Sequence, residues 1–206
     1  LWLALLAQGT ATSIAEFQSL LPLLLAHDAS LEPSAIAAGA TCWHLGILLS
    51  VIGCGVLLDR TTSMLQRLLI VPLTGATAAL FFLAAEAGTG ADSTLFAGYA
   101  KLPLAFALGA TAAPAIYLVS ATTVTRHAGK RLAPTISALC DMTGYTGNVL
   151  LLAFGPAGQG VAGPAMLRAT GMYAAANAVL VTALYVLEAH REVKASHLAE
   201  PLLPSS

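Results

Sequence analysis

Long apolar stretches alternate with short polar ones along this chain. Six apolar segments are each long enough, or nearly so, to cross about 30 Å of hydrocarbon at 1.5 Å per helical residue. They are continuous runs without the strict alternation of strands, and only helices and closed barrels satisfy their own backbone inside a bilayer. The pattern therefore predicts an all-α membrane protein, a six-transmembrane-helix bundle with spans at residues 1–26, 35–58, 68–85, 95–124, 133–155 and 169–189. Residues 191–206 are predicted to form a disordered tail.

Basic residues gather in alternate connections between these spans. Seven of the nine lie after the second, fourth and sixth spans, whereas the other connections carry acids and a single arginine, Arg168. Because basic connections are retained on the cytoplasmic side of a membrane, the pattern predicts an integral, multi-pass membrane protein with a cytoplasmic C-terminus. It leaves open which membrane holds the protein.

Composition narrows the class of function. The chain is 57% hydrophobic and 9% charged, against about 25% charged residues in a typical soluble domain, so membrane lipid is the expected partner of its surface. A net charge of −1 without a basic cluster argues against nucleic acid. Metalloprotease, nucleophile-elbow, P-loop and dinucleotide motifs are missing, so the sequence predicts neither an enzyme nor a cofactor or metal site.

The first predicted span carries a polar stripe. Gln8, Thr12, Glu16 and Ser19 recur at spacings that place them on one helical face. An ionisable group inside a span costs roughly 2.5–3.5 kcal/mol on insertion scales and usually faces a cavity or a partner. We therefore expect a water-filled path that binds a solute. The competing interpretation is hydrogen bonding between helices in a static bundle.

A second polar stripe lies in the fifth predicted span. Asp141, Tyr145 and Asn148 are spaced i, i+4 and i+7 and offer both donors and acceptors to a polar solute. Alternatively, Asp141 pairs with a basic residue and locks the bundle.

Two further residues inside spans have open roles. Lys101 either reaches inward to an anionic substrate or extends its ammonium to the interface. His44 either titrates near neutral pH or is a satisfied hydrogen-bonding residue.

The segment that leaves the second span reads Gly55-Val-Leu-Leu-Asp59-Arg60. It resembles the G-x-x-x-D-R loop motif of the major facilitator superfamily. The resemblance implies that Gly55, Asp59 and Arg60 act at a cytoplasmic gate. The usual glycine and basic pair just downstream are replaced by Thr61-Thr-Ser-Met-Leu-Gln.

Residues 113–123, a basic loop and residues 133–147, which include the run Asp141-Met-Thr-Gly144-Tyr-Thr-Gly147, are similar to the sugar-phosphate exchangers. These form the organophosphate:phosphate antiporter branch of that superfamily, to which glycerol-3-phosphate transporters belong. The resemblance implies the C-terminal half of a twelve-helix fold, whose partner is a missing N-terminal six-helix half of the same chain. The chain opens at Leu1 inside an apolar run, as expected of a piece of a longer protein.

One departure from that branch concerns the substrate. The first span holds no lysine or arginine, and its polar stripe bears Glu16 instead. A carboxylate there would repel a phosphate dianion unless protonated or paired. Either Lys101 supplies the compensating charge, or the substrate is not a phosphate ester.

The sequence therefore predicts a secondary active transporter of a small polar organic solute that works by alternating access. A sugar phosphate or glycerol phosphate exchanged for phosphate is one candidate solute. The alternative, from a different class, is a non-transporting six-helix scaffold or receptor-like subunit. The predicted substrate-binding residues are Gln8, Thr12, Glu16, Lys101, Asp141, Tyr145 and Asn148.

Overall fold

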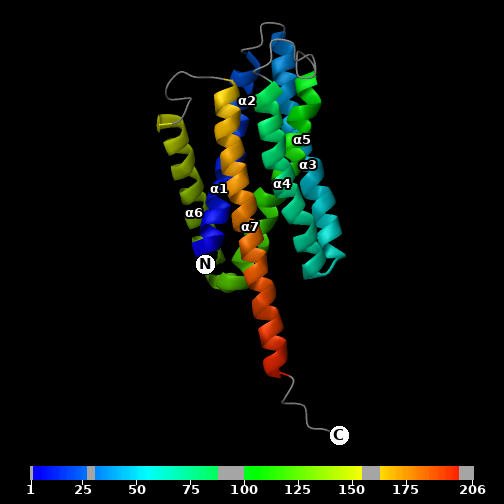
Figure 1. Ribbon diagram of the computed structural model, residues 1–206, viewed down its shortest axis with the longest axis vertical. Helices are drawn as coiled ribbons and strands as arrows, with labels where there is room; N and C mark the ends of the chain where they lie inside the picture. Colours follow the sequence, from blue (N-terminus) through cyan, green and yellow to red (C-terminus); the bar gives the residue numbers. More distant parts are fainter. Residues whose placement is uncertain (1, 27–30, 88–99, 155–162, 200–206) are drawn as a thin grey trace.

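The computed structural model describes residues 2–26, 31–87, 100–154 and 163–199, and all regular structure among them is helical. The helices run side by side as a bundle, and α7 extends beyond the others at its C-terminal end (Figure 1). The elements are α1 (Trp2–Ala15), α2 (Phe17–Ala26), α3 (Pro33–Asp59), α4 (Ser63–Ala87), α5 (Lys101–Ala113), the π-helical turn η3 (Pro114–Leu118), α6 (Val119–Phe154) and α7 (Pro164–Ala199).

Three of these helices are long and apolar enough to cross a membrane: α3 over Pro33–Leu57, α4 over Met64–Glu86 and α7 over Pro164–Lys194. Their outer faces carry large apolar side chains, and Leu48, Leu49 and Ile52 of α3 are each about half exposed. Such a surface suits lipid rather than water. The all-α class is confirmed, and three of the predicted spans coincide with helices long and apolar enough to cross a membrane.

The first predicted span is two helices that meet at Glu16. The Glu16 carbonyl accepts hydrogen bonds from the backbone N–H of Ser19 at 3.0 Å and from the Ser19 hydroxyl at 2.7 Å, which tightens the chain at this point. Pro22 lies one turn further on and lacks the N–H that a regular helix would use. Neither α1 nor α2, at 14 and 10 residues, reaches the length of about 20 residues that a crossing helix needs.

The fourth predicted span is also interrupted. α5 ends at Ala113, and Pro114 opens the π-helical turn η3 before the chain continues into α6. A proline that removes a hydrogen bond is an ordinary cause of such a local change of helix type. Gly129, with φ of 61°, then divides α6 into two arms. The predicted fifth span belongs to the second arm, and the predicted basic connection before it is helical except at this kink.

The predicted disordered tail is wrong for residues 191–199, which continue α7. Alanine, glutamate, arginine, lysine and leucine favour helix, and the segment contains neither glycine nor proline before Pro201. Residues 200–206 lie outside the described part of the chain.

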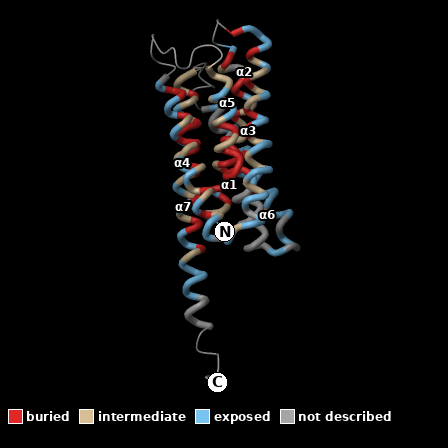
Figure 2. Tube along the Cα trace, turned by 90° about the vertical axis from the view of Figure 1, so that its right-hand side faces the viewer, coloured by how far each residue is buried: buried red, intermediate tan, exposed pale blue. Residues whose placement is uncertain are grey.

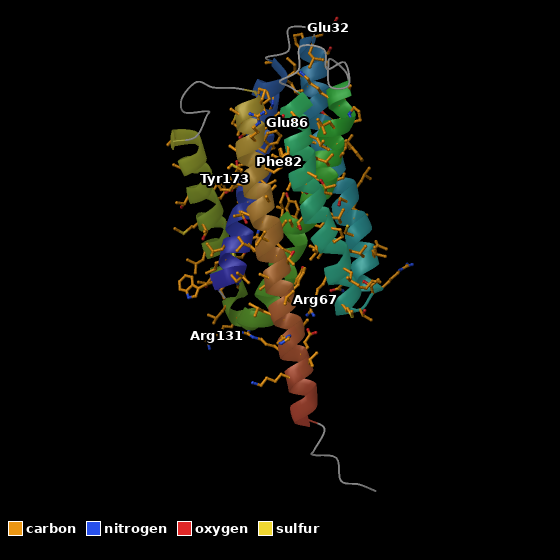
Figure 3. The ribbon with its side chains drawn as sticks, viewed as in Figure 1. Glu32, Arg67, Phe82, Glu86, Arg131 and Tyr173 are labelled. Atoms are coloured by element: carbon orange, nitrogen blue, oxygen red, sulfur yellow. The ribbon has the colours of Figure 1, made fainter. Side chains whose placement is uncertain are left out.

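Ion pairs join α4 and α7 near both ends of their contact. Arg67 contacts Glu188 and Glu192 at one end, and Glu86 contacts Arg168 at the other. The pairs are separated by about 19 residues along α4, or roughly 28 Å, which is close to the thickness of a bilayer core. Figure 3 shows Glu32 and Glu86 toward one end of the molecule, here called the acidic end, and Arg67 and Arg131 toward the other, the basic end.

Glycines let two other helix pairs approach closely. A Cβ atom on Gly46 of α3 would collide with the carbonyl oxygen of Phe106 in α5, and one on Gly109 of α5 would collide with that of Trp43. Between α1 and α6, a Cβ on Gly144 would collide with the side chain of Thr12. Close backbone approach replaces the hydrophobic drive that helices lack within a bilayer.

Buried residues concentrate along the centre of the bundle and exposed ones on its outside (Figure 2). At the level of the break in the first span, Phe17 packs edge-on against Phe81 of α4, with ring centroids 4.9 Å apart, and lies 5.5 Å from the ring of Trp43. The break therefore rests directly on an aromatic core shared by three helices.

Candidate functional site

The interruption at Glu16 is the centre of the candidate site. The Glu16 side chain is half-buried between the end of α1 and the start of α2, while Ser19 is exposed. Because α1 ends at Ala15, Glu16 and Ser19 do not continue the regular helical face that carries Gln8 and Thr12.

Gln8 connects the two interrupted spans. Its Nε2 donates a hydrogen bond of 3.1 Å to the carbonyl oxygen of Ile116, inside the π-helical turn η3. The side chain is only 6% exposed, so it lies in a helix contact and stabilises a carbonyl in an irregular turn. The residues of the predicted stripe therefore do not share one environment, because Gln8 lies in a helix contact and Glu16 lies at the break.

Thr12 also lies in a helix contact. Its hydroxyl donates to the Gln8 carbonyl at 3.0 Å, and its methyl side faces Gly144 of α6. The neighbouring Ser13 hydroxyl contacts the Gly144 carbonyl at 3.2 Å. The glycines of the 141–147 run therefore seat α6 on α1.

The acid and the phenol of the second stripe lie on the exposed surface of α6. Asp141 and Tyr145 are both exposed, Tyr145 by 55%, whereas Gly144 between them is buried against α1. Asn148 is within α6, and its side chain lies outside the described residues. Asp141 and Tyr145 are thus available to a ligand or another part of the protein, away from Gln8 and Thr12.

Lys101 is the first residue of α5 and is partly buried. The adjoining Leu102 lies beside Gly39 of α3, and Leu25 of α2 packs on the same glycine. Leu25 follows Glu16 by nine residues, or about 13 Å of helix. The structure therefore does not bring Lys101 to the break at Glu16.

The residues of the loop motif lie at the basic end. Gly55 faces open space in the last turns of α3, Asp59 ends that helix, and Arg60 follows it, both exposed. Their role in gating stays a prediction.

Sequence analysis missed the charge cluster at that end. Arg67 contacts Glu192 at 2.5 Å and Glu188 at 3.4 Å, and its guanidinium lies 6.0 Å from the Tyr185 ring centroid. Arg67 and Glu188 are both buried. The available signal was that Tyr185, Glu188 and Glu192 recur at helical spacing across the end of the last predicted span.

Asn177 of α7 was missed as well. Its Nδ2 donates to the Ala7 carbonyl at 2.7 Å and to the Thr10 hydroxyl at 3.0 Å, and the residue is 1% exposed. An amide in an apolar span was the available signal. It joins α7 to α1 by hydrogen bonds within the hydrocarbon-spanning region.

A histidine lies beside the break. The His44 Nε2 is 3.2 Å from the Gln18 Oε1, and its Nδ1 is 2.8 Å from the Ala40 carbonyl oxygen. The ring is exposed on the surface of the bundle. The interpretation of His44 as a hydrogen-bonding residue agrees with these contacts.

Within the described residues no cluster of three or more histidine, cysteine, aspartate or glutamate side chains could hold a metal ion. The chemistry available at the break is thus a carboxylate, an amide, an imidazole and hydroxyl groups, which bind polar solutes and protons. Comparison with protein-family models, curated proteins and solved structures finds no match to this chain.

Proposed function

We propose that this chain forms one six-span half of a secondary active transporter for a small polar organic solute, of the major facilitator type. In this proposal α1 and α2 make the first span, and α3 and α4 the second and third. α5, η3 and the first arm of α6 make the fourth, the second arm of α6 the fifth, and α7 the sixth.

The pairing of helices supports an internal repeat of three spans. The close pairs are α3 with α5, α1 with the second arm of α6, and α4 with α7. If the first, second and third spans are matched with the fourth, fifth and sixth, the pair of α3 with α5 corresponds to the pair of the second arm of α6 with α1. The pair of α4 with α7 then corresponds to itself. Repeats of this kind are how many transporter folds are built.

The observation that carries the proposal is that both interruptions fall at matching places in these two units. Glu16 follows the contact glycine Gly9 by seven residues, and Ile116 follows the contact glycine Gly109 by the same interval. The Gln8 hydrogen bond then joins the two interrupted spans. Interrupted helices in corresponding positions of two repeats are the best indication of a transporter binding site.

The geometry also bears on the solute. The proposed site has a carboxylate at its centre. Lys101 begins α5 next to Leu102, which lies near Leu25 of α2, and Leu25 is about 13 Å of helix from Glu16. A phosphorylated solute would therefore need its cation from another part of the complete protein. A neutral or cationic polar solute would need none.

The non-transporting scaffold remains the second candidate, because three of the polar residues within the spans are used in helix contacts. Gln8, Thr12 and Asn177 each connect neighbouring helices. In a static bundle these helix contacts would be the whole role of the three residues.

The test is solute uptake by the complete protein in proteoliposomes. Labelled phosphate, glucose phosphate and glycerol phosphate would be compared with neutral sugars and with amines. We expect uptake of at least one class, and a loss of ten-fold or more in Glu16→Gln. The matched control is Glu86→Gln, which removes an exposed carboxylate at the acidic end. Absence of uptake for every class, with a folded protein, would favour the scaffold.

A further inference from the structure

A histidine–glutamine pair links the interrupted first span to α3. Gln18 lies two residues beyond the break at Glu16, and its Oε1 is 3.2 Å from the Nε2 of His44. The other ring nitrogen, Nδ1, is 2.8 Å from the Ala40 carbonyl oxygen. Both nitrogens of this imidazole therefore face oxygen atoms.

The depth of His44 in α3 is the second observation. It follows Pro33 by 11 residues and precedes Asp59 by 15, or about 16 Å and 22 Å of helix. An ionisable side chain so far from either end of a spanning helix faces a cavity or a partner rather than lipid. His44 is nevertheless exposed on this six-span unit, so its surroundings in the complete protein are expected to be polar.

The hydrogen-bonding capacity of the ring connects these contacts to protonation. A neutral imidazole carries one N–H, whereas imidazolium carries two. Donation to both Ala40 and the Gln18 Oε1 requires the second proton. In the neutral ring, Nε2 has only a lone pair for Gln18, and the amide must turn its NH₂ group toward the ring. The number of protons on His44 thus sets the orientation of Gln18.

Few other titratable groups lie on the elements that pack against α3. They are Glu16 at the break, Tyr117 in η3 and Lys101 at the start of α5, while α2 carries none. Cys42, Cys54 and Asp59 lie on α3 itself, Asp59 as its last residue. Among these residue types, only histidine ordinarily changes charge between pH 5 and 8.

We propose that His44 is the binding site of a coupling proton, taken up from water, and that Gln18 transmits its binding to the break at Glu16. The coupling role rests on the transport function proposed above. With the proton bound, the ring donates to Gln18 and holds α2 against α3. With the proton released, the Gln18 amide turns its NH₂ group toward the ring instead, so proton affinity and the orientation of Gln18 beside the break are linked.

Proton binding can be measured without transport. Trp43 precedes His44, and its ring packs on Phe17, the neighbour of Gln18. In a variant of the complete protein whose only tryptophan is Trp43, the Trp43 emission should titrate between pH 5 and 8. His44→Gln should abolish that transition, whereas His190→Gln, an exposed histidine of α7, should retain it. A transition that persists in folded His44→Gln overturns the proposal.

A second variant serves if His44→Gln does not fold. Gln18→Glu places a carboxylate beside the ring and should raise the midpoint of the transition by about one pH unit or more, because a nearby opposite charge stabilises imidazolium. An unchanged or lowered midpoint would contradict the proposed pair.

Coupling is tested in proteoliposomes. His44→Gln should lose solute accumulation driven by a pH gradient while it retains exchange at equal pH. Wild-type accumulation and pH dependence in this variant would overturn the coupling role and leave the transport function standing. No solute movement by the wild-type protein would overturn both the transport function and the coupling role, and the Trp43 titration would then still decide whether His44 binds a proton.

Discussion

The α4–α7 pair and the two interrupted spans satisfy their backbone hydrogen bonds in different ways. α4 and α7 are uninterrupted through their contact and are joined by ion pairs near both ends. The first span breaks at Glu16, and the fourth passes through a π-helical turn at Pro114–Leu118. A continuous helix satisfies its own backbone, whereas an interrupted one depends on side chains such as Gln8. We infer that α4 and α7 form the rigid support and that the interrupted spans carry the function.

The largest effect is expected in the support. Arg67→Met removes the guanidinium that pairs with the buried Glu188 carboxylate. Breaking a buried ion pair in this way lowers stability by about 3–5 kcal/mol. Denaturant unfolding in detergent would measure it. Wild-type stability in Arg67→Met would show that these charges are hydrated and that the contact is not a rigid support.

A somewhat smaller loss is expected where helix backbones touch. Gly46→Val forces a side chain against the Phe106 carbonyl oxygen and must separate α3 from α5. Overpacking of this kind destabilises by about 1–3 kcal/mol, occasionally more. Gly53→Val in the same helix meets no atom within 4 Å and is the matched control. Equal melting temperatures for the two variants would refute the close α3–α5 contact.

Gln8 and Asn177 test whether the two regions differ in function. Gln8→Leu removes the hydrogen bond from the Gln8 Nε2 to the Ile116 carbonyl, and Asn177→Leu removes the one from the Asn177 Nδ2 to the Ala7 carbonyl. Each should destabilise by about 0.5–1.5 kcal/mol. Only Gln8→Leu, which acts on the interrupted spans, should also change the solute uptake rate several-fold once folded protein is equalised. Equal uptake in both variants would remove the functional distinction.

The smallest effect is expected at the acidic end. Arg168→Met removes an ion pair whose side chains are 48% and 66% exposed. Exposed pairs contribute about 0–1 kcal/mol and are screened by salt. Unfolding at low and high ionic strength should show little or no difference from wild type. A loss comparable to that of Arg67→Met would mean that this pair is shielded from water.

Much of the fold follows from local pattern. Continuous apolar runs predict the all-α class and the spans of α3, α4 and α7, because their length and composition suffice to cross a bilayer. Proline alone does not locate the interruptions, because Pro114 opens η3 whereas Pro72 lies inside the continuous helix α4. The helical continuation to Ala199 was missed because polar composition alone does not separate a disordered tail from an exposed helix.

The candidate site depends on which helices lie opposite one another. The spacing of Gln8, Thr12 and Glu16 predicts one polar face, yet the three residues have different surroundings. Gln8 bonds to the Ile116 carbonyl, Thr12 packs on Gly144, and Glu16 lies at the break. Arg67 and Glu188 are distant in the chain and meet only because α4 and α7 pack antiparallel.

The sequence by itself determined that this chain is helical and suited to lipid, because the free energy of burying a run of apolar residues depends on the run alone. Tertiary structure decided which polar groups lie in packing and which lie at the break. A hydrogen bond or an ion pair needs two partners at fixed geometry, and only the packed helices supply the second.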